Sequence, residues 1–179
     1  MVKFDERAIL DNGAYIYAMR QEIEAIADAV CEKGFDNILF TASGGSLAMM
    51  QPFDYMISVM SGLDVRSQVS AELLGIGNNR LTDRTLVFMA SKSGDTKETV
   101  EAAGYVKEKG AAIISVLGVE GSPLGGLSDY TVVYKDGRPQ EYVLYVLVGR
   151  ILHNKGYFDD YVQFADELKN LPAALVSVG

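Results

Sequence analysis

The feature that most constrains the fold is a set of short apolar segments that alternate with longer segments of helical periodicity. Residues 37–42, 85–90 and 112–117 are apolar runs with little polar alternation, and residues 64–70 and 130–134 are two further strand candidates. Apolar runs of this kind are typical of strands covered on both faces, and strands that alternate with helices favour a parallel sheet with right-handed crossovers. We therefore predict an α/β fold, a three-layer α/β/α sandwich around a five-stranded parallel sheet of the Rossmann or flavodoxin-like type.

Helical patterns fill the segments around these strands. Apolar residues recur at helical spacing over residues 6–33, which predicts one long helix, and over residues 47–61. A third helix is predicted over residues 95–109, where Asp95 and Glu98 are spaced as a capping box. The helices and strands thus follow one another in the order that βαβ units require.

The pattern divides the chain into three parts without a visible linker. We predict an N-terminal helix in residues 1–35, the α/β domain in residues 36–156, and a C-terminal helix and tail in residues 157–179, with a break at Pro172. A helix predicted over residues 141–152 is apolar on all sides. Such a helix either lies inside the domain or is covered by a partner on one side, and we expect a homodimer.

Charge and cysteine content restrict the partners and the cellular location. The net charge is -8, from 16 basic and 24 acidic residues, which opposes binding to nucleic acids and to anionic membranes. Cys31 has no cysteine partner, and neither a signal-peptide pattern nor an apolar run near the ~20 residues of a membrane span is visible. We expect a cytoplasmic protein. Because His153 is the single histidine, we expect no metal site, and no motif indicates a cofactor.

Two loops rich in serine and glycine carry the candidate chemistry. Residues 43–46 read Ser-Gly-Gly-Ser and residues 91–96 read Ser-Lys-Ser-Gly-Asp-Thr, and each loop follows a predicted strand. In a parallel sheet, ligands bind beyond the carboxyl ends of the strands, where helix N-termini favour anions. Serine and threonine hydroxyls donate hydrogen bonds, Gly94 allows close approach of the backbone, and Lys92 adds a positive charge. The second loop therefore suits a phosphate monoester.

Other interpretations of these loops are possible. Serine, glycine, aspartate and threonine are also the usual residues of turns and helix caps, although two such loops at one predicted edge favour a ligand site. Neither loop matches the G-x-G-x-x-G dinucleotide motif or the Walker A motif. Asp95 would repel a phosphate unless its carboxylate turns, as an N-cap, onto the amides of its own helix.

At these loops the sequence resembles the sugar isomerase (SIS) domain family. The family's phosphate loop typically reads S-x-S-G-x-T, as residues 91–96 do, and its first loop is similar to residues 43–46; the resemblance extends over about residues 36–175. The resemblance implies phosphate contacts by the side chains of Ser46, Ser91, Ser93 and Thr96. It also implies backbone contributions from Lys92, Gly94 and Asp95. Gly44 and Gly45 of the first loop are further predicted phosphosugar-binding residues. Lys92 stands where the family more often has Gln, His or Arg, which leaves the sugar selectivity open.

Within the family, the chain is similar to the first half of deglycases that split 6-phosphorylated fructose-amine adducts, and to the isomerase half of glucosamine 6-phosphate synthase. Residues 70–73 resemble an S-x-E-F segment of those enzymes, and residues 166–172 resemble the helix that leads into their second SIS domain. The resemblance covers only the first domain of those enzymes, whereas their second domain holds most of their acid and base residues. The resemblance therefore implies phosphate binding more directly than it implies catalysis.

Three residues are candidates for catalysis, because moving a carbonyl or expelling an amine requires a base near C1 or C2 of the sugar. Glu141 matches the glutamate that single-domain isomerases of the family place after the last strand, although a helix dipole also favours a carboxylate there. Glu72 is a second catalytic candidate that also suits anchoring a loop or binding a sugar hydroxyl. His153 is about 18 Å along the helix from Glu141 and suits a helix end.

The sequence therefore predicts a phosphosugar-binding SIS domain that acts as a sugar phosphate isomerase or a fructosamine 6-phosphate deglycase. The alternative is a non-catalytic phosphosugar sensor, or the isolated first SIS domain of a two-domain enzyme. In either case the expected ligand is a small-molecule sugar phosphate.

Overall fold

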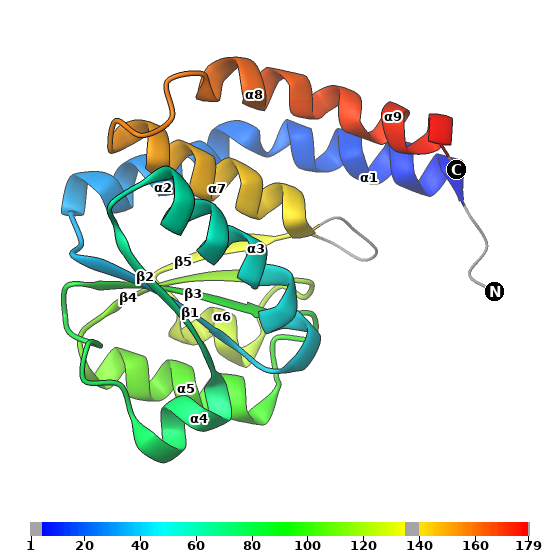
Figure 1. Ribbon diagram of the computed structural model, residues 1–179. Coiled ribbons are helices and arrows are strands. Elements are labelled where there is room, and N and C mark those ends of the chain that lie inside the picture. Colours follow the sequence, from blue (N-terminus) through cyan, green and yellow to red (C-terminus); the bar gives the residue numbers. More distant parts are fainter. Residues whose placement is uncertain (1–4, 135–139, 179) are drawn as a thin grey trace.

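The computed structural model describes residues 5–134 and 140–178, and at its centre lies a parallel sheet of five strands (Figure 1). The strand order is β2-β1-β3-β4-β5, and every neighbouring pair is parallel. The strands are β1 (Asn37–Ala42), β2 (Asp64–Val69), β3 (Thr85–Ser91), β4 (Ala112–Leu117) and β5 (Tyr130–Val133). The predicted α/β fold is confirmed, and each of the five strand candidates forms a strand.

Helices cover both faces of the sheet and complete the three layers (Figure 1). One face packs against α2, α3 and α7, and the other packs against α4, α5 and α6. The helices are α1 (Glu6–Ala18), α2 (Arg20–Lys33), α3 (Gly44–Met60), α4 (Ser70–Ile76), α5 (Lys97–Glu108), α6 (Pro123–Leu127), α7 (Gln140–Asn154), α8 (Tyr161–Glu167) and α9 (Leu171–Val178). Each predicted βα unit is therefore present, with the short helices α4 and α6 in addition.

Side chains of the central strands alternate between two cores, one on each face of the sheet. Phe40 of β1 and Phe88 of β3 stack with their ring centroids 4.9 Å apart in the core under α2, α3 and α7. Leu39 and Val87, one residue earlier in each strand, belong to the core under α4, α5 and α6. Every residue of β3 is buried, as expected for a central strand covered on both faces.

Helix α7 lies inside the molecule. Its residues Val143, Leu144, Leu147 and Val148 are fully buried, and α2, α3 and α8 pack around it. Of the two explanations for its all-round apolar surface, the internal position therefore applies. Within the described ranges no helix has both the length and the apolar character needed to cross a membrane.

The N-terminal helical segment is divided, whereas the sequence predicts one helix over residues 6–33. Helix α1 ends at Ala18 and α2 begins at Arg20, while Met19 donates its N–H to the carbonyl of Ile16, 3.0 Å away, in a tightened turn. Helix α2 packs against α7, and α1 packs against α9. The division thus separates two halves that follow different packing partners.

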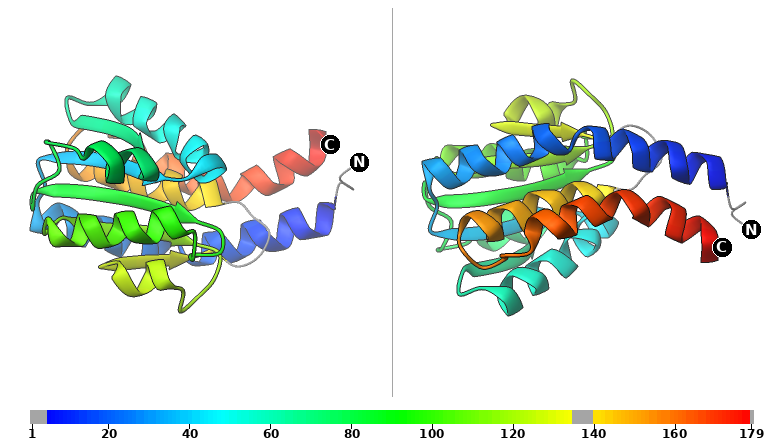
Figure 2. Two further views of the ribbon diagram at one scale, coloured as in Figure 1. Left: turned by 90° about the horizontal axis from the view of Figure 1, so that it is seen from below. Right: turned by 90° about the horizontal axis from the view of Figure 1, so that it is seen from above.

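The C-terminal segment is interrupted before the predicted position. A 3-10 turn, η1 (Leu168–Asn170), separates α8 from α9, and Pro172 is the second residue of α9. A proline in the first turn of a helix costs no intrahelical hydrogen bond. Figure 2 shows α9 beside α1, both extending past the end of the sheet. Their contact is close, because a Cβ on Gly13 would lie 2.1 Å from Cγ of Pro172.

Candidate functional site

The two serine- and glycine-rich loops meet at the carboxyl edge of the sheet. Strands β1 and β3 are parallel neighbours, so the loops that follow them emerge side by side. There they border an open pocket of about 630 Å³, a volume within the usual range for small-molecule sites. The residues that line the pocket are Ser46, Lys92, Ser93, Thr96, Gly118, Val119 and Tyr134.

The last three lining residues were not predicted from the sequence. Gly118 and Val119 follow β4, and Tyr134 follows β5, so four strands contribute to the pocket. The same rule that identified the first two loops, namely that ligands gather at the carboxyl ends of parallel strands, also points to these positions. Their signal was weaker, because no cluster of hydroxyl residues directly follows β4 or β5.

The hydroxyl groups of the second loop fall into two groups. Ser91 is only 2% exposed, and its Oγ accepts a hydrogen bond from the N–H of Gly94 at 3.0 Å and lies 3.1 Å from Oγ1 of Thr96. Ser91 therefore shapes the loop from within, around a Gly94 whose φ of +71° is rarely adopted by other residues. Ser93 and, in the first loop, Ser46 have no hydrogen-bond partner among the described residues and line the pocket.

Two helix N-termini open at this edge. Helix α3 begins at Gly44, and the side chain of its N-cap residue Ser43 makes no cap. Oγ of Ser43 instead lies 3.2 Å from Oγ1 of Thr99, which joins the first loop to the first turn of α5. Helix α5 begins at Lys97 and also has no side-chain cap. Amides of an uncapped first turn, together with the helix dipole, attract anions.

The predicted capping box of Asp95 and Glu98 is wrong. Thr96 occupies the N-cap position, and its carbonyl accepts hydrogen bonds from the N–H groups of Thr99 and Val100 at 3.0 and 2.9 Å. The N-cap therefore lies one residue later than predicted and the helix begins at Lys97, which leaves Asp95 outside it and exposed. The hydroxyl of Thr96 does not cap the helix either, because it is paired with Ser91.

The loop after β4 holds the second loop in place through its backbone. The N–H of Gly118 donates to the carbonyl of Lys92 at 3.1 Å, and the N–H of Leu124 donates to the carbonyl of Gly94 at 2.9 Å. The approach is close at Gly118, where a Cβ would lie 2.4 Å from the carbonyl oxygen of Lys92. The geometry of the pocket thus depends on a glycine outside both predicted loops.

The catalytic candidates lie on helices at the rim of the sheet. Glu141 is exposed in the first turn of α7, whose N-terminus is at the carboxyl edge, and Glu72 is exposed in the first turn of α4, directly after β2 (Figure 1). Neither carboxylate lines the pocket as the described residues form it. Next to Glu141, burial raises the pKa of Tyr142 to about 12, so its hydroxyl stays protonated at neutral pH.

His153 lies in the last turn of α7, at the other end from Glu141. Its Nδ1 is 2.8 Å from the carbonyl oxygen of Phe158. The histidine therefore holds the turn between α7 and α8, in agreement with its expected place at a helix end.

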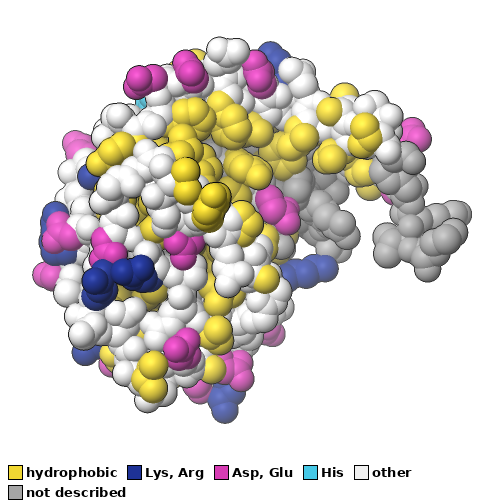
Figure 3. All heavy atoms as spheres, viewed as in Figure 1, with side chains coloured by type: hydrophobic (Ala, Val, Ile, Leu, Met, Phe, Trp, Pro, Cys, Tyr) yellow, Lys and Arg dark blue, Asp and Glu magenta, His cyan; other side chains and the backbone are white. Residues whose placement is uncertain are grey.

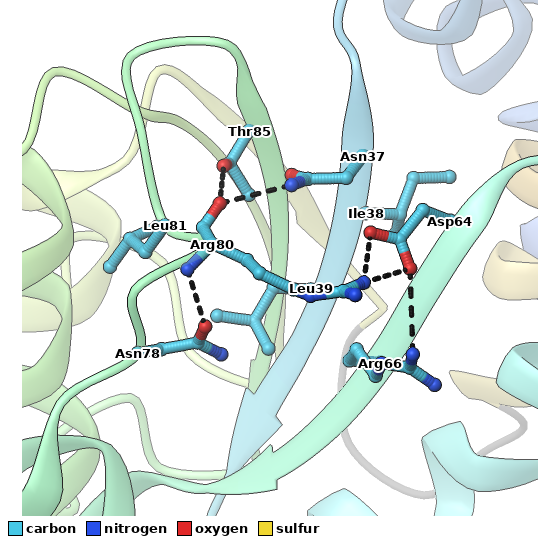
Figure 4. Close-up of a pocket in the computed structure, with 9 residues that line it drawn as sticks. All are labelled: Asn37, Ile38, Leu39, Asp64, Arg66, Asn78, Arg80, Leu81 and Thr85. Atoms are coloured by element: carbon cyan, nitrogen blue, oxygen red, sulfur yellow. Dashed lines mark hydrogen bonds and ion pairs between the residues drawn. The ribbon is translucent and has the colours of Figure 1, made fainter.

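A much smaller hollow lies at the opposite, amino edge of the sheet (Figure 4). The hollow is lined by Asn37, Asp64 and Thr85, which are the first residues of β1, β2 and β3. The side chain of Arg80 crosses it and pairs with both carboxylate oxygens of Asp64. Its volume of about 10 Å³ suffices for roughly one water molecule. The carboxyl edge is therefore the candidate site.

Comparison with known proteins identifies the same family that the two serine- and glycine-rich loops resemble, over most of the chain. The model of the SIS domain matches residues 34–148. The fructosamine deglycase FrlB of Bacillus subtilis is 30% identical over 161 residues, which are 84% of this chain and 49% of the relative. An isomerizing glutamine–fructose-6-phosphate aminotransferase of Thermotoga maritima is 28% identical over 158 residues, which are 82% of this chain and 26% of the relative.

A solved structure shares the fold closely. The crystal structure of a proposed phosphosugar isomerase of Bacillus subtilis superposes with a TM-score of 0.82 at 28% identity, over 88% of this chain and 50% of that one. This chain thus spans about half the length of that protein and of the deglycase, and about a quarter of the aminotransferase.

Proposed function

This chain belongs to the SIS domain family, and from that membership we propose that it binds a sugar phosphate with the phosphate group in the pocket at the carboxyl edge. The observation that carries the proposal is that two serine hydroxyls without a partner among the described residues lie at the same edge of the sheet as two helix N-termini without side-chain caps. Ser46 and Ser93 offer donors from two loops, and the first turns of α3 and α5 offer backbone amides.

Local donors are sufficient to hold a dianion in an acidic protein. Hydrogen bonds to a charged group contribute roughly 1.5–3 kcal/mol each. Three or four of them offset the repulsion from a net charge of -8, most of which lies outside the pocket and is screened by salt. Lys92 on the pocket rim adds a positive charge at short range.

Crystals soaked with fructose 6-phosphate test this placement directly. We expect the phosphate within hydrogen-bonding distance of Ser46, Ser91, Ser93 or Thr96, with backbone contacts from Gly44, Gly45 and the amides before α5. A sugar phosphate bound only at another place on the molecule would overturn the site assignment.

Replacing Ser93 with alanine is expected to weaken binding of fructose 6-phosphate roughly 10- to 150-fold, because one hydrogen bond to a charged group is lost. Stability should change little, since the serine is exposed and has no partner among the described residues. Titration calorimetry measures the affinity. Ser58→Ala on α3, which also removes an exposed serine hydroxyl, should bind like the parent; equal affinity of Ser93→Ala and parent would refute the role.

We further propose that the chain acts on its ligand as a sugar phosphate isomerase or a fructosamine 6-phosphate deglycase. The names of the relatives support both reactions. Each requires a base that removes a proton from a carbon next to the carbonyl or imine group, and we assign that role to Glu141, with Glu72 as the second candidate. Both carboxylates stand in first helical turns at the edge that holds the phosphate loop.

The second candidate function is phosphosugar binding without turnover. It is favoured by the length of the relatives, of which this chain spans half or less. As a sensor or as the first domain of a two-domain enzyme, the chain would hold the phosphate and leave the chemistry to other residues. Incubation with fructose 6-phosphate and with a fructosamine 6-phosphate separates the two functions, because an enzyme converts the ligand and a sensor is only stabilised by it.

We also propose a homodimer in the cytoplasm. Apolar side chains gather on the surface around α3 (Figure 3), where Tyr55 is 72% and Val59 is 64% exposed. A patch of this kind suits a second copy of the chain better than α7 does, because α7 is buried within one copy. Sedimentation analysis of the parent and of Tyr55→Ser measures the state; an unchanged monomer in both would contradict the dimer.

A further inference from the structure

The loop between β4 and α6 contains a buried hydroxyl without a partner. Ser122 is 6% exposed, and its Oγ has no hydrogen-bond partner in residues 5–134 and 140–178. The group lies against the phosphate loop, since a Cβ placed on Gly94 would be 2.1 Å from this oxygen. The unpaired hydroxyl thus packs directly on the Cα of the residue that gives the loop its left-handed turn.

An unpaired hydroxyl at this position lowers the stability of the fold, and the contacts in the structure show no stabilising role for it. Buried polar groups are nearly always hydrogen-bonded, and one that is not loses the solvation it had in water. Ser122 precedes α6 but makes no side-chain cap there. Alanine would fill the same space without the loss, so the hydroxyl is best explained by a partner that it meets in another state of the loop.

The hydrogen bonds around Gly94 indicate what would change in such a state. The N–H of Gly94 donates to Oγ of Ser91, and the hydroxyls of Ser91 and Thr96 bond to each other. These donors point into the loop. If these donors turned toward an anion in the pocket, they would give up the bonds they make now, and the backbone of Gly94, the neighbour of Ser122, would shift with them.

We propose that Ser122 is a positioning residue of the phosphate loop, whose hydroxyl gains a hydrogen bond to the backbone of Gly94 when a phosphate occupies the pocket. The inference rests on the proposed function. A group that is penalised in the free form and satisfied in the bound form shifts the equilibrium of the loop toward the bound form. Ser122 therefore raises phosphate affinity without touching the phosphate.

The test compares Ser122→Ala with Ser128→Ala. Ser128 lies at the other end of α6, and its Oγ donates to the carbonyl of Leu124 at 2.8 Å, so it is a serine of the same segment with a satisfied hydroxyl. Unfolding midpoints without ligand, and dissociation constants for fructose 6-phosphate and for inorganic phosphate, are measured for both variants and the parent.

Ser122→Ala is expected to unfold at the same temperature as the parent or at a higher one, and to bind both ligands about 2- to 12-fold more weakly, the effect of one neutral hydrogen bond. Ser128→Ala should show the opposite pattern, with a lower midpoint and parental affinity. A merely structural serine would behave like Ser128. A phosphate-bound crystal structure should place Oγ of Ser122 within hydrogen-bonding distance of the Gly94 backbone.

Two results would overturn the inference. A lower midpoint of ligand-free Ser122→Ala would show that the hydroxyl already has a partner, for example a buried water. Parental affinity in Ser122→Ala, with binding that remains sensitive to Ser93→Ala, would refute this inference and leave the proposed function intact. A parent that binds neither ligand would refute both.

Discussion

Replacing Glu141 with glutamine is expected to lower the turnover of a sugar phosphate substrate by roughly 10²–10⁴-fold, the usual contribution of a general base. Glutamine keeps the size of the side chain and removes the group that accepts the proton. Phosphate-dependent stabilisation should survive, because the serine-rich loops of the proposed phosphate site lie after other strands. Steady-state kinetics together with thermal unfolding, each with and without ligand, separate the two effects.

Glu167→Gln provides the matched control, because Glu167 is an exposed glutamate at the end of α8 and should leave turnover unchanged. Activity that persists in Glu141→Gln would contradict the assignment and move the chemistry to Glu72 or to a neighbouring subunit. A parent chain that binds sugar phosphates and converts none of them would favour the sensor or first-domain function, in which another domain supplies the base.

Replacing Gly118 with alanine is expected to weaken binding of fructose 6-phosphate by about 100-fold or more, although residue 118 belongs to neither serine-rich loop. The new Cβ would lie 2.4 Å from the carbonyl oxygen of Lys92 and 3.3 Å from Oη of Tyr134. The first neighbour is backbone and cannot turn away, so the phosphate loop must shift. Each hydrogen bond to a charged group that the shifted loop loses costs roughly 1.5–3 kcal/mol, so the loss of two such bonds weakens binding by about 100-fold or more.

The same substitution should lower stability, since forcing extra atoms into a packed region typically costs about 1–3 kcal/mol. Gly126→Ala is the control: Gly126 lies in α6, and a Cβ there meets no atom within 4 Å. It should bind like the parent and unfold no earlier, because alanine favours a helix more than glycine does. Parental affinity in Gly118→Ala would show that the loop does not depend on this contact.

The sheet was predictable because its signal is local. Strand β3 is buried on both faces, so all of its residues are apolar or small. Such a run without polar alternation can be identified from the sequence alone. The two serine-rich loops were predictable for a similar reason, since each follows such a run directly. The pocket as a whole was not, because the approach of Gly118 and Tyr134 to these loops depends on β4 lying next to β3 and β5 lying next to β4 in the sheet, and no short segment of sequence specifies that order.

The wrong predictions concern helix ends, where tertiary partners outweigh local preference. Asp95 is a good N-cap residue, but the interaction between Ser91 and Thr96 holds the chain so that the helix starts after Thr96. The helical pattern of residues 6–33 is continuous in sequence. Its first half, α1, packs against α9 and its second half, α2, packs against α7, so the helix is interrupted between them. In both cases the contact that sets the helix end involves residues outside the local sequence pattern that predicts the helix.

The pairing of α1 with α9 has a consequence for how the protein forms during translation. Gly13 in α1 packs against Pro172 in α9, and about 150 residues separate the two helices along the chain. At roughly 5–20 residues per second, the ribosome needs on the order of 8–30 s to make that intervening stretch. Helix α1 is therefore complete long before α9 exists, and its contact with α9 is among the last contacts of the described residues to form. During this interval the surface of α1 that later packs against α9 is free to bind chaperones or other apolar segments of the chain.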